Sequence, residues 1–407
     1  MADQEQIARP FLRRVRIKNF KSIEHCHVEL GPLTALVGRN GSGKSNFLDA
    51  LHFVADALRT SLDHAIKARG GIDEVRRRST GHPRNFAIEL EANLPEWRLA
   101  TFGFEVAARK NGAWAVKQER LRILDGKGTV VAYYHRAESE VVEASVENAP
   151  PVLEDRLYLV NAAGLPAFRP AYDSLLAMGF YSLNPDAIKE LQNPDAGEIL
   201  REDGSNIASV VARLNAQQPE TLERVRSYLS TIVQEITKVD RVALGPRETL
   251  QFWQRVQGSP HPWRFYAASM SDGTLRALGA LVATNQLTNG SQPVRLVGIE
   301  EPETALHPAA AGALMDALRE AAVHTQIVIT SHSPDLVDQL DLEADTLLAV
   351  ASTEGTTAIG PADQASLEAV RKHLYSAGEL LRMDQLQPDL EALARQAQAD
   401  LFADPAG

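Results

Sequence analysis

Residues 33–59 read LTALVGRNGSGKSNFLDALHFVADALR, and this stretch decides the fold class. Its first six residues form an apolar run typical of a buried strand. From Ser45 onward, apolar residues recur at helical spacing. The loop between them fits G-x-x-x-x-G-K-[ST] at every fixed position and consists of Gly38, Arg39, Asn40, Gly41, Ser42, Gly43, Lys44 and Ser45. A strand, a glycine-rich loop and a helix in this order predict a phosphate-binding loop, called the phosphate loop below.

The residue types of the phosphate loop suit a nucleotide. Glycines let consecutive backbone N–H groups turn inward toward phosphates, and the helix that follows adds its positive dipole end. We expect Lys44 to contact the β- and γ-phosphates and Ser45 to offer its hydroxyl to Mg²⁺. The alternative is a glycine-rich turn with a solvated lysine, but such a pattern arises by chance in only about one chain in a hundred of this length.

Acidic residues follow a second apolar run later in the chain. VRLVGI (294–299) reads as a buried strand and continues into Glu300, Glu301, Pro302 and Glu303. Carboxylates at the end of a buried strand are costly unless a cation lies there. Together with the phosphate loop, they indicate that Glu300 holds Mg²⁺ through water and that Glu301 polarises the attacking water. On an extended strand end, the two side chains are expected to point to opposite faces. A solvated acidic turn is the alternative.

Composition excludes several classes of protein. The 407 residues include 44% hydrophobic residues, one Cys and a formal charge of −11. No uncharged apolar run reaches 18 residues, so no membrane span is expected. The N-terminal residues lack the apolar core of a secretory signal, and one Cys cannot form an internal disulfide. We therefore expect a cytoplasmic protein with no membrane partner.

The charge is unevenly spread. Residues 1–90 carry 15 Lys and Arg against 10 acids, whereas residues 341–407 carry 4 against 12. The basic run Arg76-Arg77-Arg78, with Arg84, is a candidate for contact with phosphates of a nucleotide or DNA. A solvated surface run is the equal alternative.

Four further motifs occur in a fixed order along the chain: KNFKS (18–22), SMSDGT (269–274), EPETALHP (301–308) and TSHSPDL (330–336). Together with the phosphate loop, they resemble the ATPase heads of the RecF/SMC/OLD group of the ABC-type ATPase superfamily. Stand-alone bacterial AAA family ATPases of that group are the most similar. The resemblance covers roughly residues 11–350.

The resemblance implies roles for individual residues. Ser271, Asp272 and Gly273 match the signature motif that caps the γ-phosphate of a nucleotide held by a second subunit. Glu301 matches the catalytic glutamate, and His332 matches the switch histidine that senses the γ-phosphate.

Other implied roles have plain structural alternatives. Lys21 matches a basic residue near the phosphates, and 303–307 match a loop that contacts the dimer partner. Residues 269–274 also read as a helix N-cap, His332 as a structural histidine and His307 as a cap ahead of Pro308. The Walker B acid, which is usually Asp in ABC-type enzymes, is Glu300 in this chain. No clear Q-loop motif occurs, and Gln118 is a candidate for its glutamine.

The fold class expected on these grounds is α/β: a P-loop NTPase of the ABC-type head class, with a mixed sheet, an antiparallel β meander and a helical lobe. The head would span 11–352, with a nucleotide-binding lobe over 11–165 and 290–352 and a helical lobe over 166–289. Residues 353–407 would form an acidic helical tail. The 225 or so residues between phosphate loop and signature show no sustained heptads, so a coiled-coil arm is not expected.

The expected function is an ATP-hydrolysing switch with ATP and Mg²⁺ as cofactors, which forms a homodimer around ATP. By resemblance, its task would lie in DNA repair or anti-phage defence, with DNA as a partner. The alternative is a regulatory scaffold that controls a separate effector, a nuclease or toxin encoded nearby, without gripping DNA. A transporter subunit fits the motifs less well.

Overall fold

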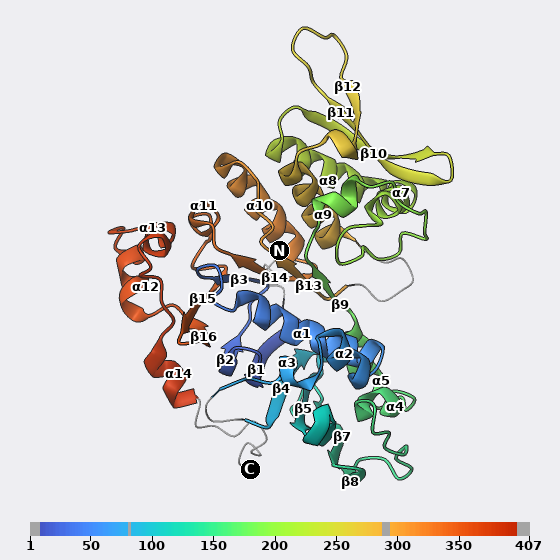
Figure 1. Ribbon diagram of the computed structural model, residues 1–407, viewed down its shortest axis with the longest axis vertical. Helices are drawn as coiled ribbons and strands as arrows, with labels where there is room; N and C mark the ends of the chain where they lie inside the picture. Colours follow the sequence, from blue (N-terminus) through green and yellow to red (C-terminus); the bar gives the residue numbers. More distant parts are fainter. Residues whose placement is uncertain (1–8, 80–82, 287–293, 397–407) are drawn as a thin grey trace.

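The computed structural model describes residues 9–79, 83–286 and 294–396, and one mixed sheet of 13 strands runs through it (Figure 1). The strand order is β8-β7-β6-β5-β4-β1-β2-β16-β15-β3-β14-β13-β9. The neighbouring strands of its parallel part are β9 (Met178–Tyr181), β13 (Leu296–Glu300), β14 (Gln326–Ser331), β3 (Leu33–Val37) and β15 (Thr346–Thr353).

The centre of the sheet is covered on both faces, which explains its apolar strands. Every residue of β3 and β14 is buried. Along β3, Leu33, Ala35 and Val37 pack into one hydrophobic core, whereas Leu36 packs into a second core on the other face. Helix α1 (Lys44–Arg59) contributes its apolar side to the second core.

The register aligns the carboxyl ends of the central strands. Val37 lies opposite Ser331, and Thr330 lies opposite Glu300. The phosphate loop, the acidic segment after β13 and the segment after β14 therefore leave the sheet at the same edge, where ligands bind in open α/β sheets.

The expected antiparallel meander is confirmed. Its strands are β1 (Leu12–Phe20), β2 (Ile23–Glu29), β4 (Asn85–Asn93), β5 (Leu99–Ala108), β6 (Trp114–Leu124), β7 (Val130–Ala137) and β8 (Glu140–Ala144). The fully buried Glu119 on β6 fixes the next helix, because its carboxylate accepts hydrogen bonds from Tyr134 Oη (2.7 Å) and the Tyr158 and Leu159 amides (2.6 and 2.8 Å). Burial raises the pKa of Glu119.

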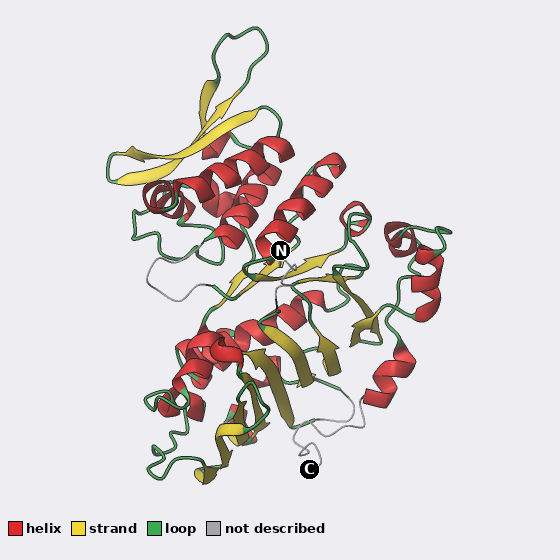
Figure 2. Cartoon of the chain, turned by 180° about the vertical axis from the view of Figure 1, so that it is seen from behind, coloured by secondary structure: helices red, strands yellow, loops and turns green. Residues whose placement is uncertain are grey.

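The short helices beside the meander are α2 (Leu62–Ala68), α3 (Ile72–Val75), α4 (Tyr158–Ala162) and α5 (Arg169–Leu176). A helical lobe packs on the face of the large sheet that lies opposite α1. At its far end, this lobe carries a three-stranded antiparallel sheet (Figure 2). It comprises α6 (Pro185–Lys189), α7 (Ile207–Gln217), α8 (Pro219–Ile232), β10 (Ile236–Leu244), β11 (Arg247–Gln254), β12 (Trp263–Tyr266) and α9 (Asp272–Asn285). Helix α10 (Ala311–Ala322) packs against α8 and α9.

Two strands lie where helix was expected. Strand β9 lies near the start of the helical lobe expected over 166–289; at four residues it is too short to show a period. Strand β16 (Thr356–Pro361) begins the segment predicted as a helical tail and pairs with β15 through the Glu354-Gly355 turn. Its branched Thr and Ile residues favour a strand. The remaining helices are α11 (Pro334–Val337), α12 (Gln364–Arg371), α13 (Ala377–Arg382) and α14 (Leu390–Gln396).

Two further expectations concern helix length and Cys26. Within the described ranges, the longest helix has 16 residues, as expected of a chain without a coiled-coil arm, and no helix is long and apolar enough to cross a membrane. Cys26 is buried, and burial raises the pKa of its thiol. The division into lobes stays a prediction.

Candidate functional site: the phosphate loop and its carboxylates

Residues of β15 and β16 pack closely against the phosphate loop. Gly43 has φ 100°, and a Cβ there would lie 2.1 Å from Thr357 Oγ1. A Cβ on Gly38 would lie 2.1 Å from the Val350 carbonyl oxygen. Gly41, at φ 77°, has open space where its Cβ would be. The glycines thus serve two purposes: close packing on one side and a clear, left-handed backbone turn on the other.

Thr357 connects the loop to the β1–β2 turn. Its hydroxyl donates to the Ser42 carbonyl (2.9 Å) and shares a 2.7 Å hydrogen bond with Ser22 Oγ. Asn46 of α1 donates to the same Ser22 oxygen at 2.6 Å. The motif that contains Ser22 therefore supports the loop from a distant part of the sequence. No feature of the sequence around Thr357 pointed to this contact.

Lys44 lies inside the loop that it belongs to. Its Nζ donates to the carbonyls of Gly38 (2.8 Å) and Arg39 (2.9 Å), and the residue is only 5% exposed. Burial lowers the pKa of Lys44, and the nearby carboxylates of Glu301, Glu303 and Glu300 oppose that shift. The predicted lysine and the predicted acids are therefore electrostatic neighbours.

The cradle fits a phosphate group. Ser42 Oγ is buried, and in the described part of the chain it has no hydrogen-bond partner. The loop also offers the open side of Gly41 and the N-terminus of a 16-residue helix. Ser45 is exposed at the start of that helix. No group of three or more His, Cys, Asp or Glu side chains in the described ranges could hold a metal ion alone, whereas Mg²⁺ in such sites is bound largely by phosphates and water.

Glu301 and His332, two residues singled out in the sequence for separate roles, lie in contact. Glu301 Oε1 lies 2.9 Å from His332 Nδ1, and Thr304 Oγ1 donates to Glu301 Oε2 at 3.3 Å. Both Glu301 and His332 are about one-third exposed. A water molecule could therefore reach the carboxylate.

The predicted geometry of the acid pair was wrong in one respect. Glu300 ends β13, but Glu301 has φ 43° and is no longer part of an extended strand. Its amide donates to the Thr330 carbonyl (3.1 Å) and hydroxyl (3.2 Å). This anchor, and not strand alternation, directs the Glu301 side chain toward His332.

Glu303 is buried more deeply than either neighbouring acid. Its Oε1 accepts from Ser331 Oγ at 2.5 Å, and its Oε2 is buried with no partner among the described residues. Burial raises the pKa of Glu303. Sequence reasoning assigned it only to a partner-contacting loop. The sequence held one signal for the burial of Glu303. This residue lies two positions after Glu301 and opposite a serine that ends a buried strand.

The signature residues lie beside the loop that follows Glu303. Ser271 Oγ caps α9 by accepting from the Thr274 amide (3.2 Å), and Asp272 pairs with Lys189 at 2.5 Å. A Cβ on Gly273 would lie 2.2 Å from the Ala305 carbonyl oxygen. Nδ1 of His307 accepts from the Ala309 amide at 3.2 Å, as a cap ahead of Pro308 would.

This signature region borders a hollow of about 410 Å³. In the described ranges, no hydrogen bond or ion pair joins Ser271, Asp272 or Gly273 to residues 38–45 of the same chain.

Among the described residues, the side chains of the two remaining predicted residues, Lys21 and Gln118, pair with acids outside residues 38–45. Lys21 has φ 48° and pairs with Asp49, in the second turn of α1, at 2.6 Å. Gln118 lies on β6 and donates to Glu105 at 2.8 Å, in the meander and away from the strand ends. A Q-loop role for Gln118 is not supported.

The arginine run is extensively paired. Arg76 bonds Asp73 (2.7 Å), Arg77 contacts Glu24 (3.2 Å), and Arg78 bonds Glu74 (2.5 Å).

Two family profiles match the chain. Residues 11–110 match one described as "AAA ATPase domain", and residues 166–338 match one described as "AAA domain, putative AbiEii toxin, Type IV TA system". The chain is an ATPase that contains AAA ATPase sequence over these two ranges. The profiles cover the phosphate loop in one case and the carboxylates, Ser271–Gly273 and His332 in the other.

Similar proteins agree with this assignment. An "OLD nuclease" from Thermus scotoductus is 45% identical over 51 residues, which are 12% of this chain and 10% of that protein. The chain thus matches about a tenth of the length of that curated relative. Among solved structures, an SMC head bound to the C-terminal winged-helix domain of ScpA has a TM-score of 0.52 at 14% identity, covering 88% of this chain and all of that one.

A Pyrococcus furiosus SMC head with an extended coiled coil, bound to the C-terminal domain of ScpA, has a TM-score of 0.51 at 11% identity, with 90% and 99% coverage. At these identities, the two structures establish the shared fold.

Proposed function

We propose that this ATPase is a switch that dimerises around ATP. The phosphate loop of one copy would face Ser271–Gly273 of another, and hydrolysis would release the pair. The observation that carries the proposal is the contact between Glu301 and His332 at the sheet edge where Lys44 also lies. The lack of any hydrogen bond or ion pair between Ser271–Gly273 and residues 38–45, within the described ranges, supports a second copy as the partner of the signature residues.

Each site residue has a proposed role. Lys44 and the amides of residues 38–45 bind the phosphates, with Lys21 as a nearby positive charge. Ser45 and Glu300 would hold Mg²⁺, and the ion would supply neutralisation of the phosphate charge. Glu301 accepts a proton from the attacking water, and His332 orients that carboxylate through the 2.9 Å contact.

Substitution of Glu301 by Gln tests the dimer. The amide cannot take the proton from water, so ATP stays bound and the dimer accumulates. We expect light scattering to give twice the monomer mass with ATP and the monomer mass without it. The double variant Glu301→Gln/Lys44→Ala is the control, because it cannot hold the phosphates and should remain monomeric. A Glu301→Gln variant that binds ATP and stays monomeric rules out the ATP-dimer proposal.

We propose DNA repair or anti-phage defence as the task, with duplex DNA as the partner. The support is the motif resemblance and the 51-residue match to an OLD nuclease. The ATPase rate should rise with duplex DNA, and binding should weaken steeply between two salt concentrations, since phosphate contacts release counterions. No stimulation and no salt-dependent binding would exclude this task.

The second candidate is a cytoplasmic scaffold whose ATP state controls a separately encoded effector, a nuclease or toxin. The family description that names a toxin system and the −11 charge favour it. In that case, Glu301→Gln with ATP should capture the effector when the two are co-expressed, and Lys44→Ala should not. Equal capture by both variants would contradict control by ATP.

A further inference from the structure

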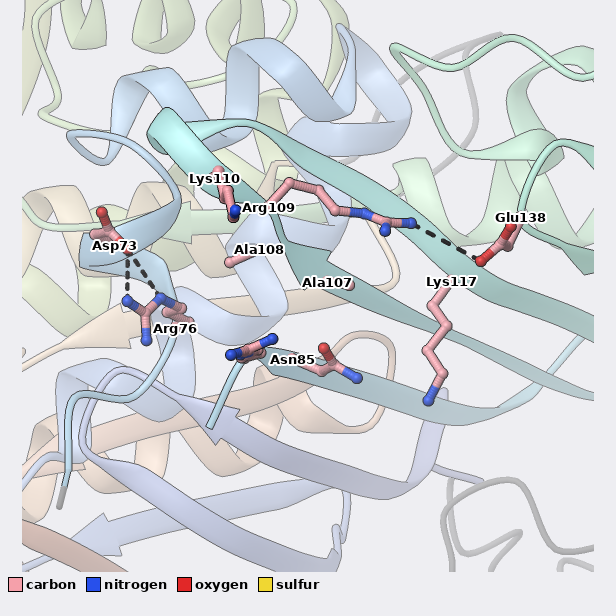
Figure 3. Close-up of a pocket in the computed structure, with 10 residues that line it drawn as sticks. Asp73, Arg76, Asn85, Ala107, Ala108, Arg109, Lys110, Lys117 and Glu138 are labelled. Carbon is pink, nitrogen blue, oxygen red and sulfur yellow. Dashed lines mark hydrogen bonds and ion pairs between the residues drawn. The ribbon is translucent and has the colours of Figure 1, made fainter. Parts of the chain in front are cut away.

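A basic hollow of about 700 Å³ lies on the meander, outside the phosphate-loop site (Figure 3). It is bounded by α3, the start of β4, the turn between β5 and β6, and the first part of β6. Its size is in the range of small-molecule sites. None of the residues to which the ATP switch proposal gives a role lines this hollow.

Five cations line the hollow, against two acids: Arg76, Arg84, Arg109, Lys110 and Lys117, with Asp73 and Glu138. In the described part of the chain, no ion pair neutralises Arg84 or Lys110, and the Arg109–Glu138 pair is long at 3.8 Å. The hollow therefore has uncompensated positive charge, although the whole chain is acidic.

The other cations are held in place. Asp73 fixes Arg76 at 2.7 Å, and Glu105, next to the hollow, accepts from Lys117 (3.2 Å) and from Asn85 Nδ2 (2.6 Å). These carboxylates reduce the net charge but position the donors in advance. Preorganised donors bind an anion at a lower entropic cost than free surface lysines do.

The lining points to the chemistry of the ligand. The other described residues that line the hollow are Asn85, Ala107 and Ala108, so none of the described lining residues is aromatic. A nucleobase would find no stacking surface there. The guanidinium groups instead match phosphate oxygens, which they bind in a bidentate manner.

A short anion fits better than a long one. The acids Asp73 and Glu138 lie on opposite sides of the hollow in Figure 3, and Glu74 and Glu140 are exposed next to them in sequence. Such acids repel a polyanion that extends beyond the hollow. We propose that this hollow binds the phosphate chain of a small molecule that carries two or three linked phosphates.

The test uses inorganic tripolyphosphate and titration calorimetry without Mg²⁺, in a Lys44→Ala background that removes the phosphate-loop site. We expect about one equivalent to bind per chain. Arg84→Glu/Arg109→Glu should weaken that binding by about tenfold or more, since each substitution removes a charged hydrogen-bond donor. The matched control is Arg122→Glu/Lys127→Glu, because both residues are exposed cations on the same meander and lie outside the hollow. This control should change the affinity less than about twofold.

Arg84→Gln/Arg109→Gln, which removes charge without reversing it, should weaken binding in the same direction, and thermal unfolding should show that all variants fold. Three results would overturn the inference. The first is no tripolyphosphate binding in the Lys44→Ala background, and the second is equal weakening by the test and control double charge reversals. The third is an Arg84→Glu/Arg109→Glu variant that loses binding to duplex DNA but binds tripolyphosphate as before. The last result would assign the patch to nucleic acid. None of these outcomes depends on ATP-driven dimerisation, so the switch proposal can stand if this one fails.

Discussion

The phosphate loop and the signature region, two parts of one proposed active site, are built in opposite ways. The loop is fixed within its own chain: Lys44 is buried, Gly43 is packed against Thr357, and Thr357 is bonded to Ser42 and Ser22. Ser271 and Asp272 are instead exposed, with one cap and one ion pair between them. Under the proposed dimer, the phosphate-loop half-site is complete in the monomer and the signature half-site is presented to a second molecule.

The largest expected effect comes from Lys44→Ala. This substitution removes the only cation of the loop that lies among Glu300, Glu301 and Glu303. We expect the ATPase rate to fall about a hundredfold or more, as when a preorganised charge stabiliser is deleted. Steady-state phosphate release measures it. Lys67→Ala, an exposed lysine on α2, is the control and should retain full activity. A Lys44→Ala variant with near-normal turnover would show that the loop is not the catalytic half-site.

Thr357→Val should show that the loop depends on β16. The substitution keeps the shape of a 2% exposed residue but leaves the Ser42 carbonyl without its donor. We expect a loss of about 1–3 kcal/mol in the free energy of unfolding and a higher KM for ATP. Urea denaturation measures the stability, and Thr353→Val, at the exposed end of β15, should change it by less than about 0.5 kcal/mol. Equal effects from both variants would contradict a role for Thr357 in holding the loop.

Much of the phosphate-loop half-site could be predicted from the sequence, because it is built from short local motifs. The loop, its flanking strand and helix, β13 and β14 all follow from short motifs whose spacing reflects the register of parallel strands. The same holds for the meander, where turns and alternating residues have a local signature.

Contacts between distant segments could not be predicted in this way. Thr357 reaches the loop across more than 300 residues of sequence, and β16 and the four-residue β9 carry too little periodic signal to be assigned. The conformation of Glu301 was also missed, because its positive φ follows from a hydrogen bond to Thr330 that only the folded sheet creates. Local propensity cannot encode a tertiary anchor.

Glu303 lies on the segment after β13 that links the phosphate-loop site to the signature region. The titration of Glu303 tests whether this segment is tightly buried in the folded protein. Its pKa is raised in the folded protein, so the folded state holds a proton that the unfolded chain has already released. Stability therefore falls as pH rises from the unfolded pKa through the folded one, and the penalty is fully present above it. Glu303→Gln removes this penalty. The melting temperature of this variant should therefore increase relative to that of the wild type as pH rises from acidic to neutral. Glu343→Gln, at an exposed acid, should show no such trend, and a pH-independent difference for Glu303→Gln would argue against burial.

The smallest expected effect concerns the ion pair at the signature residues. Lys189 Nζ lies 2.5 Å from Asp272 Oδ1, but the two side chains are 28% and 54% exposed, so solvent and salt screen the pair. Lys189→Ala should cost at most about 1 kcal/mol of unfolding free energy, less at high salt, and should leave ATP-driven dimers of the Glu301→Gln variant intact. Lys67→Ala, which breaks an exposed pair with Asp63, gives the reference value in the same denaturation experiment. A loss well above that reference would mean that Asp272 is anchored within its own chain. The signature region would then be built like the phosphate loop, and the contrast between a completed half-site and one presented to a second molecule would no longer hold.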